Sequence, residues 1–381
     1  MSPLSGVRVV EIAGLGPGPF CGMMLADMGA DVLVIDRPGA RIDAADPLQR
    51  SRTRLTLDLK TAAGCDALLT LVEKAEVLFE GFRPGVAERL GFGPEVCLAR
   101  NPALVYGRMT GWGQEGPLAK AAGHDINYIA LSGALMAIGR EGEPPVPPLN
   151  LLGDFGGGGM MLAFGIVCAL LESKRSGQGQ VVDAAMVDGS VALMAMMLGL
   201  RNQGLACDAP GTHLFSGAAH AYGCYETQDG KYISIAPIEP AFYEQFIDKL
   251  GLDRERFVPY ALQLGSGNDP RAWADLKKEL TRIFKTRTRD EWCALLEGSD
   301  SCFAPVLSLS EAPVHTHNRT RGNFVEVEGV VQNAPAPRFS RTPPRSPTPS
   351  ATDAQALENC LVRWGVDAAG VSRIQAAIIG G

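Results

Sequence analysis

The stretch VRVVEIAGLGPGPFCGMMLADMGADVLVIDRP, residues 7–38, decides the fold. Its β-branched run Val7–Ile12 predicts a strand, and the glycines and prolines of Gly14–Pro19 predict a turn. The apolar spacing over Phe20–Met28 predicts a helix, and the apolar run Ala30–Ile35 predicts a second strand. Strand, glycine turn, helix and strand together form a βαβ unit, in which the two strands are parallel.

The residues that follow repeat this alternation of strands and helices. We expect helices over residues 62–74 and 84–90, and strands over residues 77–79 and 104–108. Such alternation favours a mostly parallel sheet covered by helices, so the sequence predicts an α/β, Rossmann-like large domain. Ligands of these sheets bind in the crevice at the carboxyl ends of the strands.

The second half of the chain changes character after about Gln203. Before that point, two long apolar helices are expected over residues 155–171 and 180–200, the second broken at Asp188-Gly189. After it we expect a smaller α/β domain, with the following elements: a strand at 232–236 and helices at 240–250, 271–284 and 289–296. The Pro-rich residues 333–350 predict an extended segment before a terminal helix at 357–364. The predicted domains are 1–202, 203–330 and 331–381.

Composition excludes several classes of function. The 381 residues carry 35 Lys and Arg against 42 Asp and Glu, a net charge of −7, and no segment concentrates the cations. An extended nucleic-acid groove is therefore not expected, although a local phosphate site remains possible. The nine cysteines are scattered without zinc spacing, which indicates reduced thiols in a cytoplasmic protein. The chain starts without a signal-peptide pattern, and the apolar run Met160–Leu171 is too short to cross a bilayer, so no membrane partner is expected.

The glycine turn imitates a dinucleotide-binding fingerprint. Gly14 and Gly16 are followed about twenty residues on by Asp36, but the third glycine position is Pro19. Proline removes a backbone donor that a pyrophosphate would need, so NAD or FAD is not expected. Arg37 suits a ribose phosphate, or else is a solvated surface arginine.

Three residues are candidates for acid–base chemistry, each with a simpler structural alternative. Asp154 precedes four glycines and a helix, where a carboxylate either caps the helix or serves as a base. His124, in Gly123-His124-Asp125, and Glu239, directly after a strand, are structural residues in most such contexts. The sequence contains neither a serine-hydrolase motif nor a Walker A motif, and no metal site is expected.

The whole set of motifs, in this order, resembles the class III CoA-transferase superfamily, most closely its α-methylacyl-CoA racemase branch. The resemblance covers nearly the full chain, and it rests on these stretches: 4–11, 14–19, 29–38, 57–60, 80–91, 109–114, 123–128, 147–150, 153–159, 179–183 and 238–240.

The resemblance implies an isomerase of lipid metabolism that interconverts the two epimers of a 2-methylacyl-CoA thioester without a cofactor. In family terms His124 is the base for the S epimer and Asp154 the base for the R epimer. Glu239 would hold the imidazole by a hydrogen bond, and the backbone N–H of Asp125 would meet the thioester oxygen. Inversion through a planar enolate needs one base on each face of the α-carbon, which a histidine and a carboxylate can supply.

The resemblance also implies a CoA site and an interlocked homodimer whose active site is shared between the large domain of one chain and the small domain of the other. The residues assigned to CoA are Arg37, Leu57, Lys60, Gly81, Arg83, Arg89, Gly123, Asn127 and Tyr128. One departure from the racemase pattern lies at residues 215–222, where FSGAAHAY replaces a glycine- and proline-containing stretch, so acyl specificity is left open.

Two other functions are compatible with this fold. In a class III CoA transferase, Asp154 would attack the thioester as a nucleophile and form an acyl anhydride. His124 argues against this alternative, because the transferases generally lack a histidine at this position. A catalytically silent CoA-binding protein is the other alternative, and the intact set of His124, Asp154 and Glu239 argues against it.

Overall fold

The computed structural model describes residues 1–261 and 270–378, which form two compact units. Unit 1 comprises Met1–Ser132, Leu149–Leu193 and Thr316–Gly381, and unit 2 comprises Gly133–Pro148 and Met194–His315. These limits differ from the predicted domain limits at residues 202 and 330. Residues 133–148 belong to unit 2, and the chain from Thr316 onward belongs to unit 1.

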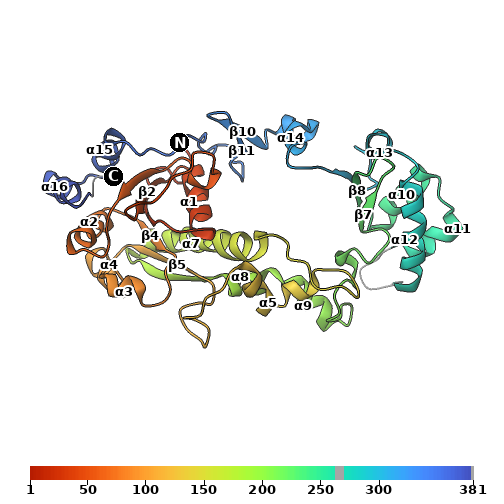
Figure 1. Cartoon of the computed structure of the whole chain (residues 1–381), viewed down its shortest axis with the longest axis horizontal. Coiled ribbons are helices and arrows are strands. Elements are labelled where there is room, and N and C mark those ends of the chain that lie inside the picture. The colour runs from red at the N-terminus through yellow and green to blue at the C-terminus, as the bar shows by residue number, and fades with distance from the viewer. Residues whose placement is uncertain (262–269, 379–381) are drawn as a thin grey trace. The chain divides into compact units, whose positions relative to one another are not determined.

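Unit 1 is built on a six-stranded sheet with the order β3-β2-β1-β4-β5-β6, in which every neighbouring pair is parallel (Figure 1). The strands are β1 (Arg8–Ile12), β2 (Asp31–Asp36), β3 (Thr53–Thr56), β4 (Val77–Glu80), β5 (Val105–Thr110) and β6 (Gln180–Ala185). The predicted α/β class with a parallel sheet is confirmed.

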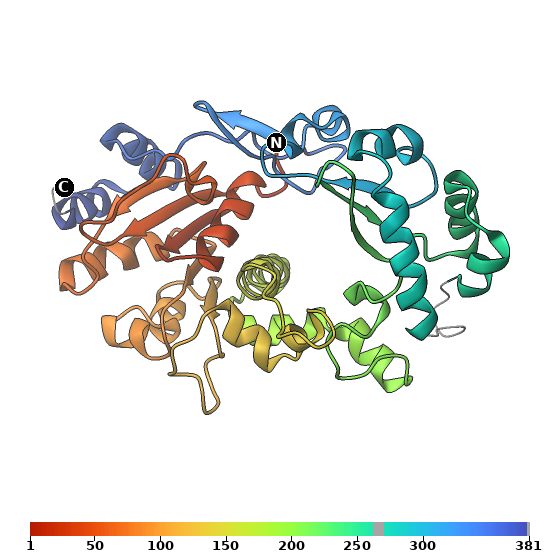
Figure 2. The ribbon, with the colours of Figure 1, turned by 45° about the vertical axis from the view of Figure 1, so that its right-hand side comes forward.

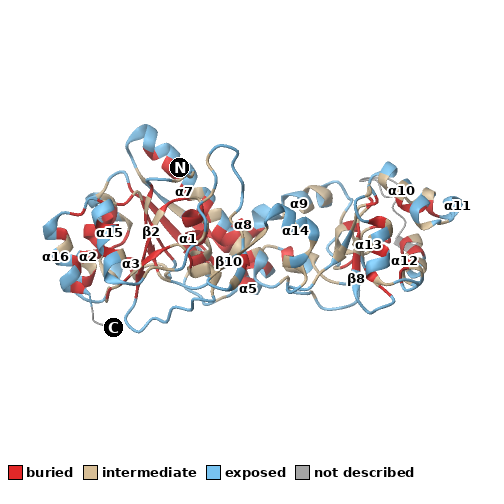
Figure 3. Cartoon of the chain, turned by 90° about the horizontal axis from the view of Figure 1, so that it is seen from above, coloured by how far each residue is buried: buried red, intermediate tan, exposed pale blue. Residues whose placement is uncertain are grey.

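Alternate residues of the inner strands β2, β1, β4 and β5 pack against helices on opposite faces of this sheet. The helices of unit 1 are α1 (Pro17–Asp27), α2 (Ala62–Val72), α3 (Val86–Leu90), α4 (Pro94–Arg100), α5 (Asp125–Leu131), the π-helix η2 (Leu151–Met160), α7 (Met161–Ser176), α8 (Met186–Leu193), α14 (Thr316–Arg321), α15 (Ala354–Arg363) and α16 (Ala368–Ala377). Val10 packs with α2 and the two C-terminal helices, whereas its neighbour Val9 packs with α1 and α7. Both faces are thus buried, as parallel sheets require (Figure 3).

The C-terminal part of unit 1 is longer and more regular than predicted. Strands β10 (Phe324–Val327) and β11 (Val330–Asn333) form an antiparallel hairpin, which the sequence did not suggest. The following segment runs largely extended beside β3, where Ala351 bridges Thr53. The predicted terminal helix corresponds to α15, and α16 was missed.

Residues 180–200 are the clearest error of the sequence interpretation. The expected helix is instead the edge strand β6, then α8, a break at Met194, and α9 (Ala195–Asn202). The β-branched pair Val181 and Val182 favours a strand, and pairing with β5 from Val105 to Thr110 satisfies its backbone. An apolar run of this length has no period that separates a buried strand from a helix.

Unit 2 contains a three-stranded antiparallel sheet covered by helices. Its strands are β7 (Gly223–Glu226), β8 (Tyr232–Ile235) and β9 (Phe303–Val306). Its helices are α6 (Ala134–Ala137), α9, α10 (Pro240–Leu250), α11 (Arg254–Phe257), α12 (Pro270–Phe284) and α13 (Arg289–Leu296). The core of unit 2 is aromatic and includes Tyr243, Phe284 and Trp292. The predicted strand at 232–236 and the three predicted helices are present within one residue.

The helix formed by η2 and α7, Leu151–Ser176, is the one helix of the described residues that is long and apolar enough to cross a membrane. The core helices of soluble proteins meet the same criterion, and 44% of the most apolar part of this helix is buried. Figure 2 views this helix nearly along its axis. Met160, Phe164, Val167 and Leu171 form an exposed stripe at helical spacing on one side of it. The predicted run at 160–171 therefore lies inside a longer apolar helix.

Candidate active site

Two adjoining cavities of unit 1 lie at the carboxyl edge of the sheet. The larger has a volume of about 950 Å³ and the smaller about 390 Å³. Ile12, Gly14, Leu15 and Phe82 line both of them. Ile12 ends β1 and Phe82 follows β4, so the cavities occupy the place where ligands of parallel α/β sheets bind. Their shared walls make room for one long ligand.

The glycine turn between β1 and α1 forms a wall of the smaller cavity. Gly16 has a φ of +66°, which a residue with a side chain rarely adopts. A Cβ at Gly16 would also lie 3.3 Å from Asp154 Oδ2. Pro17 then starts α1 with the φ that a helix requires. The turn thus brings backbone directly against the carboxylate of Asp154.

Asp154 lies in the first turn of the π-helix η2 and lines the smaller cavity. Its Oδ2 accepts a hydrogen bond from Asn150 Nδ2 at 3.2 Å. Burial raises the pKa of the Asp154 carboxyl above its ordinary value, the bond from Asn150 opposes this, and the negative charge of Asp125 adds to it. A charge on His124 lowers the same pKa, so the two candidate bases interact electrostatically. A carboxylate with a raised pKa is a stronger base near neutral pH.

His124 stands at the N-cap position of α5 and lines the same cavity as Asp154. Its backbone N–H donates to Asn127 Oδ1 at 3.0 Å, while its side chain is exposed to the cavity. The preceding carbonyl, that of Gly123, accepts a hydrogen bond from the Tyr128 hydroxyl. These two bonds fix the peptide group between Gly123 and His124, from which the imidazole projects.

A pair of aromatic rings packs against the turn that carries Gly123 and His124. Trp112 and Tyr128 pack edge to face with their centroids 4.8 Å apart. A Cβ at Gly111 would lie 2.1 Å from the Tyr128 ring, and one at Gly123 would lie 2.8 Å from it. Both glycines are therefore needed for close packing against Tyr128, rather than for a left-handed conformation.

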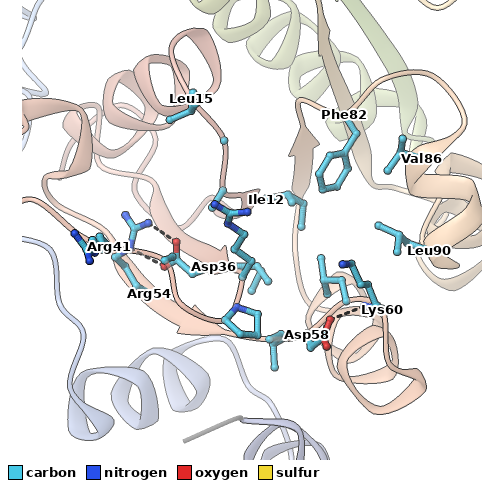
Figure 4. A pocket seen from close by; sticks show the side chains of 18 of the residues that line it. Ile12, Leu15, Asp36, Arg41, Arg54, Asp58, Lys60, Phe82, Val86 and Leu90 are labelled. Atoms are coloured by element: carbon cyan, nitrogen blue, oxygen red, sulfur yellow. Dashed lines mark hydrogen bonds and ion pairs between the residues drawn. The ribbon is translucent and has the colours of Figure 1, made fainter. Parts of the chain in front are cut away.

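The larger cavity is lined by cations and apolar residues from β2, α3 and the loops that follow β2 and β3 (Figure 4). Arg37, Arg41, Lys60 and Arg89 supply positive charge, and Leu57 supplies apolar surface. Arg37 is exposed, and Arg89 Nη1 donates to the Gly85 carbonyl at 3.1 Å. A small number of placed cations is what a phosphate-bearing ligand requires, even in an acidic protein.

The carboxylate of Asp36, which resembles the ribose-binding carboxylate of a dinucleotide site, is paired with Arg54. Arg54 Nη2 donates to Asp36 Oδ1 at 2.6 Å, and Arg54 Nε donates to Oδ2 at 2.8 Å (Figure 4). Both side chains are almost fully buried. A carboxylate that accepts such a bidentate pair is not free for a ribose hydroxyl.

The turn after β4 is held by a buried glutamate. Glu80 Oε2 accepts the backbone N–H of Phe82 at 2.5 Å, and Arg108 Nε donates to Oε1 at 3.2 Å. Burial raises the pKa of Glu80 to about 7, while its bond to Phe82 and the charge of Arg108 lower it. This carboxylate shapes the segment Gly81–Arg83, which lines the smaller cavity.

The structure brings together most of the predicted site residues. The smaller cavity is lined by Gly81, Arg83, Gly123, His124, Tyr128 and Asp154. The larger cavity is lined by Arg37, Leu57, Lys60 and Arg89. Asp125 and Asn127 are not among the lining residues of either cavity, but each bonds one of the candidate bases: Asn127 Oδ1 accepts the His124 N–H, and Asp125 Oδ2 accepts the Asp154 N–H. Glu239 belongs to unit 2, at the N-cap position of α10. The roles of all these residues stay predictions.

Three residues of the site were missed from the sequence: Asn150, which bonds Asp154; Arg41, which lines the larger cavity; and Glu80, which bonds Phe82. Asn150 stands four residues before Asp154, the spacing of one helical turn, and this could have suggested the contact. Arg41 and Glu80 carry no comparable local signal. Among the described residues, no group of three or more His, Cys, Asp or Glu side chains could hold a metal ion.

Comparison with known proteins defines the class. The profile of CoA-transferase family III matches residues 4–353, and the chain belongs to this family. Among its relatives are the α-methylacyl-CoA racemases of Mus musculus and Homo sapiens, 46% and 44% identical over 341 residues. Each alignment covers 89% of this chain and 87% of the relative. A probable fatty acyl-CoA transferase of Mycobacterium tuberculosis is 30% identical over 79% of this chain and 82% of the relative.

Solved structures agree with this assignment. A CaiB/BaiF family protein from Brucella suis superimposes with a TM-score of 0.79 at 25% identity, covering 96% of this chain and 100% of the other. A Mycobacterium tuberculosis protein superimposes with a TM-score of 0.75 at 26% identity, covering 95% and 99%. The predicted family membership is therefore confirmed.

Proposed function

We propose that this protein is an α-methylacyl-CoA racemase, which interconverts the two epimers of a 2-methyl-branched acyl-CoA thioester. The observation that carries the proposal is the presence of His124 and Asp154 in one cavity, beside a second cavity lined by cations. The 46% and 44% identity to two proteins named as racemases supports the same activity.

The chemistry follows from the two bases. One base removes the α-proton, and the electron pair of the broken C–H bond moves into the thioester to form an enolate. The other base then gives a proton to the opposite face of the α-carbon. Only protons are exchanged, so the reaction as proposed needs neither a metal nor a redox cofactor. His124 serves the S epimer and Asp154 the R epimer in this scheme.

The developing negative charge on the thioester oxygen needs a hydrogen-bond donor. Asp125 is the first residue of α5, so its backbone N–H has no acceptor within the helix. This supports the predicted role of the Asp125 N–H as that donor. In the proposed homodimer, Glu239 of one chain is assigned to the His124 imidazole of the other as a hydrogen-bond partner that fixes its tautomer.

The CoA part of the substrate is assigned to the larger cavity. Arg37, Lys60 and Arg89 would face its phosphates, and the shared wall at Ile12 and Phe82 leads to the smaller cavity. The pantetheine arm would then pass along Gly81 and Gly123 toward the bases. A long narrow ligand with charge at one end matches this pair of cavities.

The protein is further proposed to act as a homodimer in the cytoplasm. The exposed stripe of Met160, Phe164, Val167 and Leu171 supports a second copy as the partner of α7, because a row of apolar side chains is costly in water. A dimer also fits the shared active site that the family resemblance implies. The scattered cysteines support a reducing compartment.

A CoA transferase is the second candidate function, since Asp154 could attack the thioester and the transferase relative is 30% identical. The two functions differ in the fate of the α-proton. We expect the protein, incubated in D₂O with one epimer of a 2-methylacyl-CoA, to incorporate deuterium at the α-carbon and to yield both epimers. Transfer of CoA to an added free acid, without α-exchange, would support the transferase instead. If the protein catalyses neither α-proton exchange nor CoA transfer, both proposed functions are contradicted.

A further inference from the structure

The carboxylate of Asp125 makes contacts that its proposed role as a backbone donor does not use. Its Oδ2 accepts the backbone N–H of Gly153 at 2.7 Å and that of Asp154 at 2.8 Å. Asp125 is only 6% exposed, and its Oδ1 has no hydrogen-bond partner within the described chain. A buried carboxylate is costly to maintain, so these two bonds must stabilise something specific.

These bonds fall where the helix that carries Asp154 begins. The first N–H groups of a helix have no acceptor within it, and η2 begins at Leu151. Asp125, from a different helix, supplies the missing acceptor for the third and fourth residues of η2. A Cβ at Gly153 would lie 2.6 Å from Asp125 Oδ2, so only glycine admits the carboxylate at this distance. The close contact thus depends on both residues, the carboxylate at position 125 and the glycine at position 153.

We propose that the Asp125 carboxylate is the positioning group for Asp154, holding the backbone of this base in register with His124. Asp125 is a positioning residue in this role, because its carboxylate acts through Asp154 and not on the substrate. The inference rests on the proposed racemase function.

The position of Asp125 in the chain links the two bases. His124 directly precedes it, and Asp154 N is bonded to its side chain. The separation of the bases across the α-carbon is therefore set by one residue of α5 and two hydrogen bonds. A nearby residue of α5 acts on the other base, since Asn127 Oδ1 accepts the N–H of His124.

The charge of Asp125 has a second effect on Asp154. The titratable groups that face Asp154 are His124, Asp125 and Tyr128. The negative charge of Asp125 raises the pKa of Asp154, whereas a positive charge on His124 lowers it. Replacing Asp125 by asparagine keeps an oxygen acceptor for the two N–H groups but removes this charge. The acid limb of the pH profile should then move to lower pH.

The test compares exchange with inversion for each epimer separately, in D₂O. With Asp125→Ala, we expect inversion to fall at least about tenfold, the order expected when hydrogen bonds to a charged group are lost. The epimer deprotonated by His124 should still exchange its α-proton, so its ratio of exchange to inversion rises. The epimer deprotonated by Asp154 should lose both processes. Asn127→Ala is the matched variant, and it should show the opposite asymmetry because it loosens His124.

Asp125→Asn keeps the inference testable if the alanine variant does not fold. It should invert faster than Asp125→Ala, with its acid limb at lower pH than that of the wild type. Equal loss of exchange and inversion for both epimers, with an unshifted pH profile, would show that Asp125 only supports the fold and would overturn the inference. The proposed function fails separately, when the wild-type protein itself does not invert the substrate.

Discussion

Protonation of His220 should destabilise unit 2 as the pH falls from 6.5 toward 4. His220 is fully buried among aromatic rings, and its Nε2 lies 2.6 Å from the Tyr243 hydroxyl. Its Nδ1 has no partner among the described residues. Burial lowers the pKa of His220 from 6.5 to about 4, because the imidazolium would carry a proton at Nδ1 without an acceptor.

The sign and size of this pH effect on stability follow from the different pKa values of His220 in the folded and unfolded chain. The unfolded chain binds a proton at His220 below pH 6.5, whereas the folded chain does so only below about pH 4. The stabilising contribution of the neutral imidazole is therefore complete above pH 6.5 and is lost as the pH falls to 4. A difference of about 2.5 pKa units corresponds to about 3 kcal/mol of unfolding free energy.

The assay is urea unfolding between pH 7 and pH 4, followed by tryptophan fluorescence, to which Trp273 and Trp292 in the core of unit 2 contribute. The variant His220→Gln offers an amide toward Tyr243 and does not titrate here. Its free energy of unfolding, subtracted from that of the wild type at each pH, isolates His220 because all other groups cancel. We expect this difference to shrink by about 3 kcal/mol from pH 7 to pH 4. A difference that is constant with pH would refute the reasoning.

Three further substitutions have definite expected outcomes. Gly153→Ala places a methyl group 2.6 Å from Asp125 Oδ2, so the rate of racemisation should fall about a hundredfold. The affinity for CoA, measured by calorimetry, should stay within about twofold of the wild-type value. An unchanged rate would mean that the start of η2 can shift without cost. Phe164→Asp puts a charge on a side chain that is 68% exposed in the single chain. If the proposed dimer forms through this exposed stripe, sedimentation velocity should report a dimer for the wild type and a monomer for the variant. A dimeric variant would remove the stripe from the interface. Arg54→Leu leaves the buried Asp36 carboxylate unpaired and should lower the free energy of unfolding by about 3 kcal/mol. The double variant with Asp36→Leu should recover part of that loss, and no recovery would argue against the ion pair as its cause.

Much of unit 1 could be predicted because its signals are local. The run Val7–Ile12, the glycine turn and the spacing over Phe20–Met28 each correspond to one element, and β1, α1 and β2 lie there within a few residues. The prediction for residues 180–185 was wrong because they form a strand only through pairing with β5, and apolar composition does not encode that contact. The short strand β3 was missed for the same reason.

The candidate site was predictable as a set of residues but not as a geometry. His124 and Asp154 could be named from the resemblance to a family, and both line one cavity. The bond from Asp154 N to Asp125 spans 29 residues of sequence, so no spacing rule points to it. The pairing of Asp36 with Arg54 was equally hidden, although it decides that the fingerprint carboxylate is not free.

A racemase needs two bases that can each also act as an acid, since each must return the proton that the other direction removes. A carboxylate at its ordinary pKa is a poor acid partner for an imidazole at neutral pH, because it is almost always ionised. Burial and the charge of Asp125 both raise the pKa of Asp154, and Asn150 and His124 limit that rise. The fold therefore makes the Asp154 carboxyl a better proton donor at neutral pH than an ordinary aspartic acid would be. In the proposed arrangement, Asp125 both fixes the backbone of this base and, through its charge, makes the return of the proton easier.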